Sequence, residues 1–341
     1  MRVRQVIGTA LVTVLVLIAG PGALPGCASE APPATSPEAS PEPGQPVGGP
    51  FPVTMAHGLG GTTVPRQPRR IVAIGGNDAD ALYALGVTPV AVLGGRGTAD
   101  GIPPWLRGRL DPKQTAVLSS TEAVNLEHLA ALRPDLILAG SVPNIADEYA
   151  KLSRIAPTVT YARGVLTDSW QERLRLAAKA VGLEPRAEQL ITDTQRRITG
   201  FLGSHPGLEG KTISIAWANQ PGSLAVVGGD NNTTDLLRAL GLRVAPGLRD
   251  INSNTLPNAA TSLSPEQWSR LDADVVLVGA NSPDLAAAVR DSPLVRALPA
   301  IARGTYQEVD ISLLSALRVP SVLNVTWVVD QITPTLTRAA T

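Results

Sequence analysis

The sequence predicts an α/β protein built from two similar halves. From residue 69 onward, short apolar runs alternate with stretches of helical periodicity, and several of the runs end at glycine. Continuous apolar strands that alternate with helices are typical of parallel sheets covered on both faces. Two helical stretches, 168–181 and 185–203, lie between the halves. We therefore expect two α/β lobes with helices between them.

The strands and helices follow one order along the chain. The strand 71–74 ends at Gly75-Gly76, and Asn77 is expected to cap the helix 78–85, which Gly86 closes. The further predicted strands are 89–93, 135–139, 158–161, 212–216, 224–227, 275–278 and 306–309. The further predicted helices are 126–132, 145–155, 235–240, 265–271 and 321–336, with Pro334 expected to bend or fray the last one.

Two pieces of sequence recur in the same order in both halves. Residues 80–86 read DALYALG and residues 234–241 read TDLLRALG, and residues 129–140 likewise parallel 268–279. In the second pair a helix leads through an aspartate, Asp135 or Asp274, into an apolar strand. Any α/β chain contains chance echoes, but two in the same order favour a duplication.

The two central helices have clear ends. Asp168 is expected to cap the first, Gly182 ends it, and Pro185 suits the first turn of the second. The 19 residues 185–203 would form a rod of about 28 Å. A single helix that crosses from one lobe to the other would be stiffer than a hinge of two or three strands.

The N-terminus has the layout of a secretory signal peptide, with Arg2 and Arg4 before an apolar stretch at about residues 6–19. Cys27 is the only cysteine, and Leu24-Pro25-Gly26-Cys27 resembles a bacterial lipobox. The resemblance implies a diacylglyceryl group on Cys27, cleavage before it, and a lipid anchor on the extracytoplasmic side of the cell membrane. The alternative, an uncleaved anchor, would need about 20 apolar residues.

The residues after Cys27 are rich in proline, alanine, serine and glutamate and cannot bury apolar surface, so we expect a disordered tether. The expected organisation is a signal peptide at 1–26, the acylated cysteine and tether at 27–53, a first lobe at 54–166, a helix pair at 167–204 and a second lobe at 205–341.

Composition and motifs exclude several classes of function. The net charge is +0, whereas nucleic-acid binding calls for a basic surface. The three histidines His57, His128 and His205 lie in separate contexts and predict no metal site. The chain has no Gly-x-Ser-x-Gly elbow, P-loop or His-Glu-x-x-His motif. We therefore expect no enzyme and no cofactor, and a hydrolase is a minor alternative.

The order of motifs resembles the iron-siderophore class of ABC-transporter substrate-binding lipoproteins, whose fold is shared by cobalamin- and haem-binding relatives. The matching pieces are residues 68–72 with 80–87, 125–127 with 132–137, the helix pair 168–203, 264–267 with 272–275, and 294–306. The resemblance implies two Rossmann-like lobes joined by a single long helix, with the ligand in the cleft between them. It also implies a monomer that takes a ferric siderophore and delivers it to a membrane permease and its ATPase. Haem or cobalamin as ligand, and an envelope interaction protein without a transport role, are the alternatives.

The ligand should lie beyond the carboxyl ends of the strands, as it does in other open α/β sheets. A ferric chelate needs aromatic faces, hydrogen-bond donors and, for anionic types, arginines. Trp105 follows two prolines in a loop, Trp217 ends a strand, and Trp327 lies in the last helix, where core packing is the alternative. The other candidate ligand contacts are Asn77, Arg96, Ser120, Ser141, Asn219, Asn231 and Arg249.

Two further tryptophans, Trp170 and Trp268, fit helix faces and are expected in the core. Several members of the family carry an arginine before the Thr-Glu that precedes Asn-Leu-Glu, but this chain has Ser119-Ser120-Thr121-Glu122. The type of ligand therefore does not follow from the resemblance.

The resemblance also implies that one acidic residue on each lobe pairs with permease arginines. Asp147 and Glu148 begin the helix after one apolar strand, and Glu266 lies in a helix of the second half. We predict Glu148 and Glu266 as the docking pair. Acidic residues are favoured in first helical turns by the helix dipole alone, which is the structural alternative.

Overall fold

The computed structural model describes residues 51–120, 125–142, 144–165, 167–251 and 262–341, all of which fall in one compact unit. Cys27, the signal peptide and most of the tether lie outside the described residues. Among the helices of the described ranges, none combines the length and hydropathy that a membrane span requires.

The first lobe contains a sheet of five parallel strands in the order β5-β4-β3-β6-β7. Its central strands β3 and β6 are buried along their whole length, which explains why they read as continuous apolar runs. The strands are β3 (Ile71–Ala73), β4 (Ala91–Leu93), β5 (Ala116–Leu118), β6 (Leu136–Leu138) and β7 (Thr158–Val159). The helical elements are α1 (Gly76–Leu85), the 3₁₀ turn η1 (Pro104–Leu106), α2 (Leu126–Ala131) and α3 (Ile145–Ile155). An antiparallel hairpin of β1 (Val53–His57) and β2 (Gly60–Val64) precedes this sheet and was not predicted.

The second lobe contains a mixed sheet in the order β11-β9-β8-β12-β13, with β10 also paired to β8. The strands β8, β12 and β13 are parallel, as the predicted α/β layering implies, whereas β9 returns antiparallel to β8, which was not predicted. The strands are β8 (Thr212–Gln220), β9 (Ser223–Val226), β10 (Arg243–Val244), β11 (Ser262–Leu263), β12 (Val275–Ala280) and β13 (Tyr306–Val309). The α-helices are α6 (Asn232–Ala239), α7 (Pro283–Asp291), α8 (Pro293–Arg296), α9 (Pro299–Arg303), α10 (Ile311–Arg318) and α11 (Asn324–Ala340). The 3₁₀ helices are η2 (Pro206–Leu208), η3 (Pro246–Leu248) and η4 (Pro265–Leu271).

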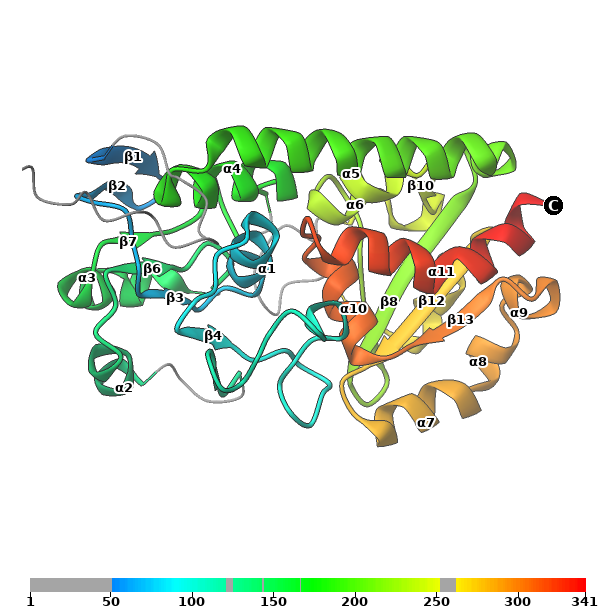
Figure 1. The fold of residues 1–341 in the computed structure, drawn as a ribbon. Helices are drawn as coiled ribbons and strands as arrows, with labels where there is room; N and C mark the ends of the chain where they lie inside the picture. The colour runs from blue at the N-terminus through cyan, green and yellow to red at the C-terminus, as the bar shows by residue number, and fades with distance from the viewer. Residues whose placement is uncertain (1–50, 121–124, 143, 166, 252–261) are drawn as a thin grey trace, which may run out of the picture. The chain divides into compact units, whose positions relative to one another are not determined.

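Between the sheets the chain forms α4 (Trp170–Val181) and α5 (Glu184–Ser204). The helix α5 contacts α1 and α4 as well as η2 and α11, so it packs against elements of both lobes (Figure 1). The α/β class and the two lobes are thus as predicted, while the single helical connection stays a prediction. One apolar cluster contains Leu82 of α1, Ile191 of α5 and Leu336 of α11, which shows that the core is continuous along this helix.

The structure corrects several predicted helix ends. Gly75, not Asn77, precedes α1, and Asn77 is buried inside it. Ser169, not Asp168, caps α4 through a capping box with Glu172. Residues 265–271 form a 3₁₀ helix. The predicted helix 321–336 is displaced to α11, which continues past Pro334 to Ala340. The expected core positions of Trp170 and Trp268 are confirmed, since each is 6% exposed.

Candidate functional site

A cavity of about 230 Å³ lies where residues of the two lobes meet. Its first-lobe wall comes from segments that follow strand ends: Gly76 and Asn77 after β3, Arg96 after β4 and Ser141 after β6. This is the place that the rule for open α/β sheets predicts. The second-lobe wall consists of Ser315, Arg318 and Val319 of the α10 end and Asn324 of α11.

Two arginines give the cavity a positive charge. The Arg318 guanidinium stacks over the Trp217 ring at 4.3 Å from its centroid, and Trp217 is buried in the middle of β8. Burial lowers the pKa of Arg318, and the nearby charge of Arg96 lowers it further. Among the described residues, neither arginine has a carboxylate within ion-pair distance. Asp80 also lines the cavity but pairs with neither arginine, and two neighbouring arginines without an ion-pair partner favour an anionic ligand.

Arg318 is not among the predicted ligand residues, although it lies in a helix, α10, that reaches the cavity. Asp310 in fact caps α10, and its side chain accepts a hydrogen bond from the Leu313 N–H at 2.7 Å. The signal was present: an aspartate precedes apolar residues Leu313, Leu314 and Leu317 at helical spacing.

The cavity shares a polar wall with the interface between the lobes. The Trp105 Nε1–H donates to both carboxylate oxygens of Asp80 at 2.9 Å, and the Ser321 hydroxyl of the second lobe donates to the same carboxylate. The Asn77 amide donates to the Pro320 carbonyl at 2.8 Å, and the Ser312 hydroxyl donates to the Arg96 carbonyl at 3.3 Å. These bonds connect the lobes directly beside the cavity.

Burial raises the pKa of Asp80 from 3.8 to about 7, against the lowering effect of the hydrogen bonds from Ser321 and Trp105. Because the folded protein holds this proton more tightly than the unfolded chain, the group stabilises the fold below about pH 4. That contribution is lost as the pH rises through about 7.

We predict that Asp80→Asn becomes more stable relative to the wild type as the pH rises from 4 to 8, because only the wild type carries this titrating group. Urea unfolding followed by tryptophan fluorescence measures this difference, and parallel pH profiles would contradict it.

A second group of buried charges lies next to Ser141. The Arg173 guanidinium donates to the carbonyls of Gly140 and Val165, and the Asp78 carboxylate accepts the Gly140 N–H at 2.7 Å. Asp168, which is not a helix cap, accepts N–H groups of residues 162–164 instead. Burial raises the pKa of Asp78 to about 6, and the charge of Arg173 opposes that rise. The cluster fixes the backbone from which Ser141 reaches the cavity.

The structure brings together four of the ten predicted ligand residues. Asn77, Arg96, Trp105 and Ser141 line the cavity, and Trp217 lies behind it as the support of Arg318. Ser120 and Asn219 are not among its lining residues in the described part of the chain. Asn231 caps α6, where its side-chain oxygen accepts the N–H groups of Thr233 and Thr234.

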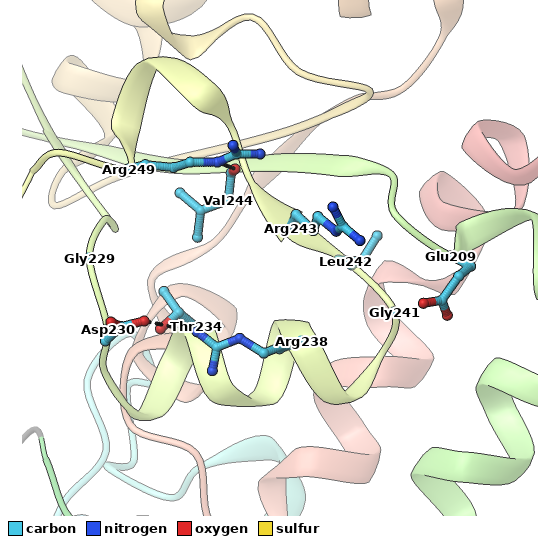
Figure 2. Close-up of a pocket in the computed structure, with 10 residues that line it drawn as sticks. All are labelled: Glu209, Gly229, Asp230, Thr234, Arg238, Gly241, Leu242, Arg243, Val244 and Arg249. Carbon is cyan, nitrogen blue, oxygen red and sulfur yellow. Dashed lines mark hydrogen bonds and ion pairs between the residues drawn. The ribbon is translucent and has the colours of Figure 1, made fainter.

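Two further candidates lie elsewhere. Trp327 packs against Trp105 with ring centroids 5.1 Å apart and faces a different groove. Arg249 lines a cavity of about 550 Å³ in the second lobe and donates from Nε to the Val244 carbonyl at 3.2 Å (Figure 2). In that cavity Arg238 is paired with Asp230 and Asp235, so much of its positive charge is already neutralised. Within the described residues, no group of three or more His, Cys, Asp or Glu side chains could hold a metal ion.

The predicted docking residues do not occupy equivalent positions. Glu266 lies in η4, which precedes β12, whereas Glu148 lies in α3, which follows β6. The Glu148 carboxylate also forms an ion pair with Lys151 at 3.0 Å. The helix that matches η4 is α2, and the residue that matches Glu266 is Glu127. Each is the second residue after its N-cap, Asn125 or Ser264. In both Asn-Leu-Glu and Ser-Pro-Glu a capping residue is followed two positions later by glutamate. This spacing, visible in the sequence, already matches Glu127 with Glu266.

Known proteins share the fold described above. The family model for periplasmic binding proteins matches residues 71–307. The probable siderophore-binding lipoprotein YfiY of Bacillus subtilis is 32% identical over 165 residues, but the match spans only 48% of this chain and 48% of YfiY, about half its length. The Fe(3+)-citrate-binding protein YfmC of the same organism is 26% identical over 74% of this chain and 76% of its own.

A crystal structure of a periplasmic solute binding protein from Mycobacterium smegmatis superimposes with a TM-score of 0.72. It is 30% identical, and the superposition covers 85% of this chain and 99% of that one. The family model covers the first five-stranded sheet, α5 and all of the second sheet except the end of β13, and the solved structure shares the fold. The chain therefore belongs to the periplasmic binding protein family.

Proposed function

We propose that the protein is an extracytoplasmic binding lipoprotein that captures an anionic ferric chelate between its lobes and presents it to an ABC importer. The observation that carries this proposal is the pair of arginines, Arg96 and Arg318, which meet in the cavity between the lobes with no carboxylate partner among the described residues. Relatives named for binding siderophores and Fe(3+)-citrate support the class of ligand.

The cavity suits the chemistry of such a ligand. The iron is cargo, and its ligands are the oxygens of the chelate, so the protein needs to recognise only the outer atoms of the complex. Guanidinium groups bind carboxylate oxygens with two parallel charge-assisted hydrogen bonds. Ser141 lines the cavity, and its hydroxyl is buried without a partner among the described residues, so a small side-chain rotation would be enough for it to bond the ligand. The Trp105 ring supplies an apolar wall.

Tryptophan fluorescence titrations with ferric citrate, ferrichrome, haem and cyanocobalamin test the proposal. We expect saturable binding of ferric citrate that weakens with added salt, because screening reduces the attraction of partly exposed charges. A preference for haem or cobalamin would favour those alternatives within the same fold. A flat response to all four compounds would contradict ligand capture and would leave an envelope interaction protein.

Lipidation belongs to the same proposal but rests on sequence alone. Cys27 lies outside the described residues. The relative YfiY is named as a probable lipoprotein, which supports an acylated cysteine. The mass of the N-terminal peptide from membranes decides the matter: a diacylglyceryl cysteine at the first position is expected, and an unmodified Cys27 within a longer peptide would contradict it. The boundaries 54–166, 167–204 and 205–341 remain proposals for the lobes and their connection.

The topology favours Glu127 and Glu266 as the pair that meets the permease. The helices α2 and η4 both begin at the carboxyl edge of their sheet, because β5 runs parallel to β4, and β11 runs in the same direction as β8 and β12. In the first lobe this is the edge that lines the cavity. Both side chains are exposed. A membrane partner could therefore contact both acids while the cavity faces it.

We predict that the double variant Glu127→Ala, Glu266→Ala lowers uptake of the ferric chelate by about tenfold or more, since each charge-assisted contact is worth about 1.5–3 kcal/mol. Affinity for the chelate should not change, because both acids lie outside the cavity. Radioactive iron uptake by cells that carry each variant measures the effect. The variant Glu148→Ala decides between the two positions on the first lobe: a loss with Glu148→Ala and none with Glu127→Ala would restore Glu148.

A further inference from the structure

A second groove, distinct from the chelate cavity, lies on the helices α5 and α11. It has a volume of about 470 Å³, which is within the range of about 300–1,000 Å³ found for small-molecule sites. Trp105 and Trp327 form an aromatic wall in which the ring planes meet at 49°. The apolar part of the lining is completed by Ala84, Leu190, Val322 and Leu323.

Basic side chains line the same groove and leave it with an excess of positive charge. Arg109 and Arg197 are exposed and make no side-chain hydrogen bond or ion pair within the described ranges. Arg186 donates to the Gln189 amide oxygen at 3.1 Å and keeps its charge. Of the two acids in the lining, Asp193 is paired with Arg196 at 3.0 Å, which leaves Asp330 against three arginines.

The groove combines an aromatic wall with arginines that have no ion-pair partner within the described ranges. Two indole rings packed against each other present apolar area that prefers a flat, weakly polar partner. Unpaired guanidinium groups at the edge of that area prefer carboxylate, sulfonate or phosphate oxygens. A molecule that has both features satisfies the whole lining at once, whereas a purely apolar or purely ionic molecule satisfies only part of it.

We propose that this groove is a second binding site, for a small aromatic anion. The ring system lies against Trp105 and Trp327, and the acidic group is held by Arg109 and Arg197. The site is separate from the chelate cavity, because its arginines are different and the two linings have a single residue in common. The two share only Trp105, whose Nε1–H is bonded to Asp80 and therefore fixes the aromatic wall.

The test uses 8-anilinonaphthalene-1-sulfonate as the probe and the folded protein as the target. Energy transfer from tryptophan to the bound dye should show one saturable site. The variant Arg109→Glu, Arg197→Glu should weaken it by about tenfold or more, the loss expected when about 1.4 kcal/mol or more of charge-assisted contact is removed. Both arginines are exposed, so the thermal melt of the variant should match that of the wild type.

A matched control separates local contact from overall charge. Arg66 and Arg154 are also exposed and make no ion pair within the described ranges, and neither lines the groove. The variant Arg66→Glu, Arg154→Glu changes net charge by the same amount and should bind the dye as the wild type does. Equal loss in both double variants, or no saturable binding by the wild type, would overturn the proposal.

Two further arms define the ligand class and the place of binding. The uncharged dye N-phenyl-1-naphthylamine should bind about tenfold more weakly or worse, because it cannot use the arginines; equal affinity would contradict an anion site. Saturating ferric citrate should not displace the anionic dye, and displacement would place the dye in the chelate cavity. The arginine variants remain decisive even for a protein that binds no ferric citrate, so the two proposals can fail separately.

Discussion

Replacing Arg318 with alanine should weaken the binding of ferric citrate by about 10- to 100-fold, the equivalent of about 1.5–3 kcal/mol for a hydrogen bond to a charged group. The guanidinium is held against the Trp217 ring and has no carboxylate partner among the described residues, so its charge is available to the ligand. Isothermal titration calorimetry measures the change directly. Arg318→Lys should recover only part of the affinity, since an ammonium group cannot make two parallel bonds.

The companion variants Arg96→Ala and Arg249→Ala locate the site. Arg96 shares the cavity with Arg318, so its removal should also weaken binding. Arg249 lies in the separate second-lobe cavity of Figure 2, and its removal decides between the two cavities. Unchanged affinity in Arg318→Ala together with a large loss in Arg249→Ala would move the ligand to that second-lobe cavity.

Arg173→Leu should lower the free energy of unfolding by about 3–5 kcal/mol, as expected when one member of a buried charge cluster is removed. Arg173 is 4% exposed and satisfies the Gly140 and Val165 carbonyls, and the charges of Asp78 and Asp168 act on it. Without it, two buried carboxyls and two buried carbonyls lose their positive neighbour. Urea denaturation at pH 7 measures the loss.

The neighbouring Arg175 provides the comparison. It lies two residues further along α4 and pairs with Glu188 at 2.7 Å, but both side chains are about half exposed. Arg175→Leu should therefore cost at most about 1 kcal/mol. Similar losses in Arg173→Leu and Arg175→Leu would show that burial does not decide the contribution of these arginines.

The parts of the fold that depend on local pattern could be predicted from the sequence. The strands at Ile71, Leu136 and Val275 are buried on both faces, so their apolar runs are unbroken and mark them clearly. The antiparallel pairing of β8 and β9 was not predicted, because periodicity gives strand position but not direction. The turn residues Pro221-Gly222 were the available signal, and Gly222 has a φ of +67°.

The site was predictable where it follows strand ends and unpredictable where it depends on the meeting of the lobes. Asn77, Arg96 and Ser141 follow strands β3, β4 and β6, so the topology places them together. Arg318 reaches the cavity only because α10 packs beside it, and that contact joins residues more than 200 positions apart. No local pattern contains this information.

The two arginines that line the cavity, Arg318 and Arg96, differ in how firmly the fold holds them. Trp217, which supports Arg318, is paired with Gly279 in β12 and with Ala225 in β9, so Arg318 packs against the centre of a sheet. Arg96 is exposed in the segment between β4 and η1 and can change rotamer without disturbing a strand. We expect Arg318 to be preorganised for ligand binding and Arg96 to adjust its position to the ligand. Under the proposed function, chelates of different diameters would then fit, because only one of the two arginines has to move.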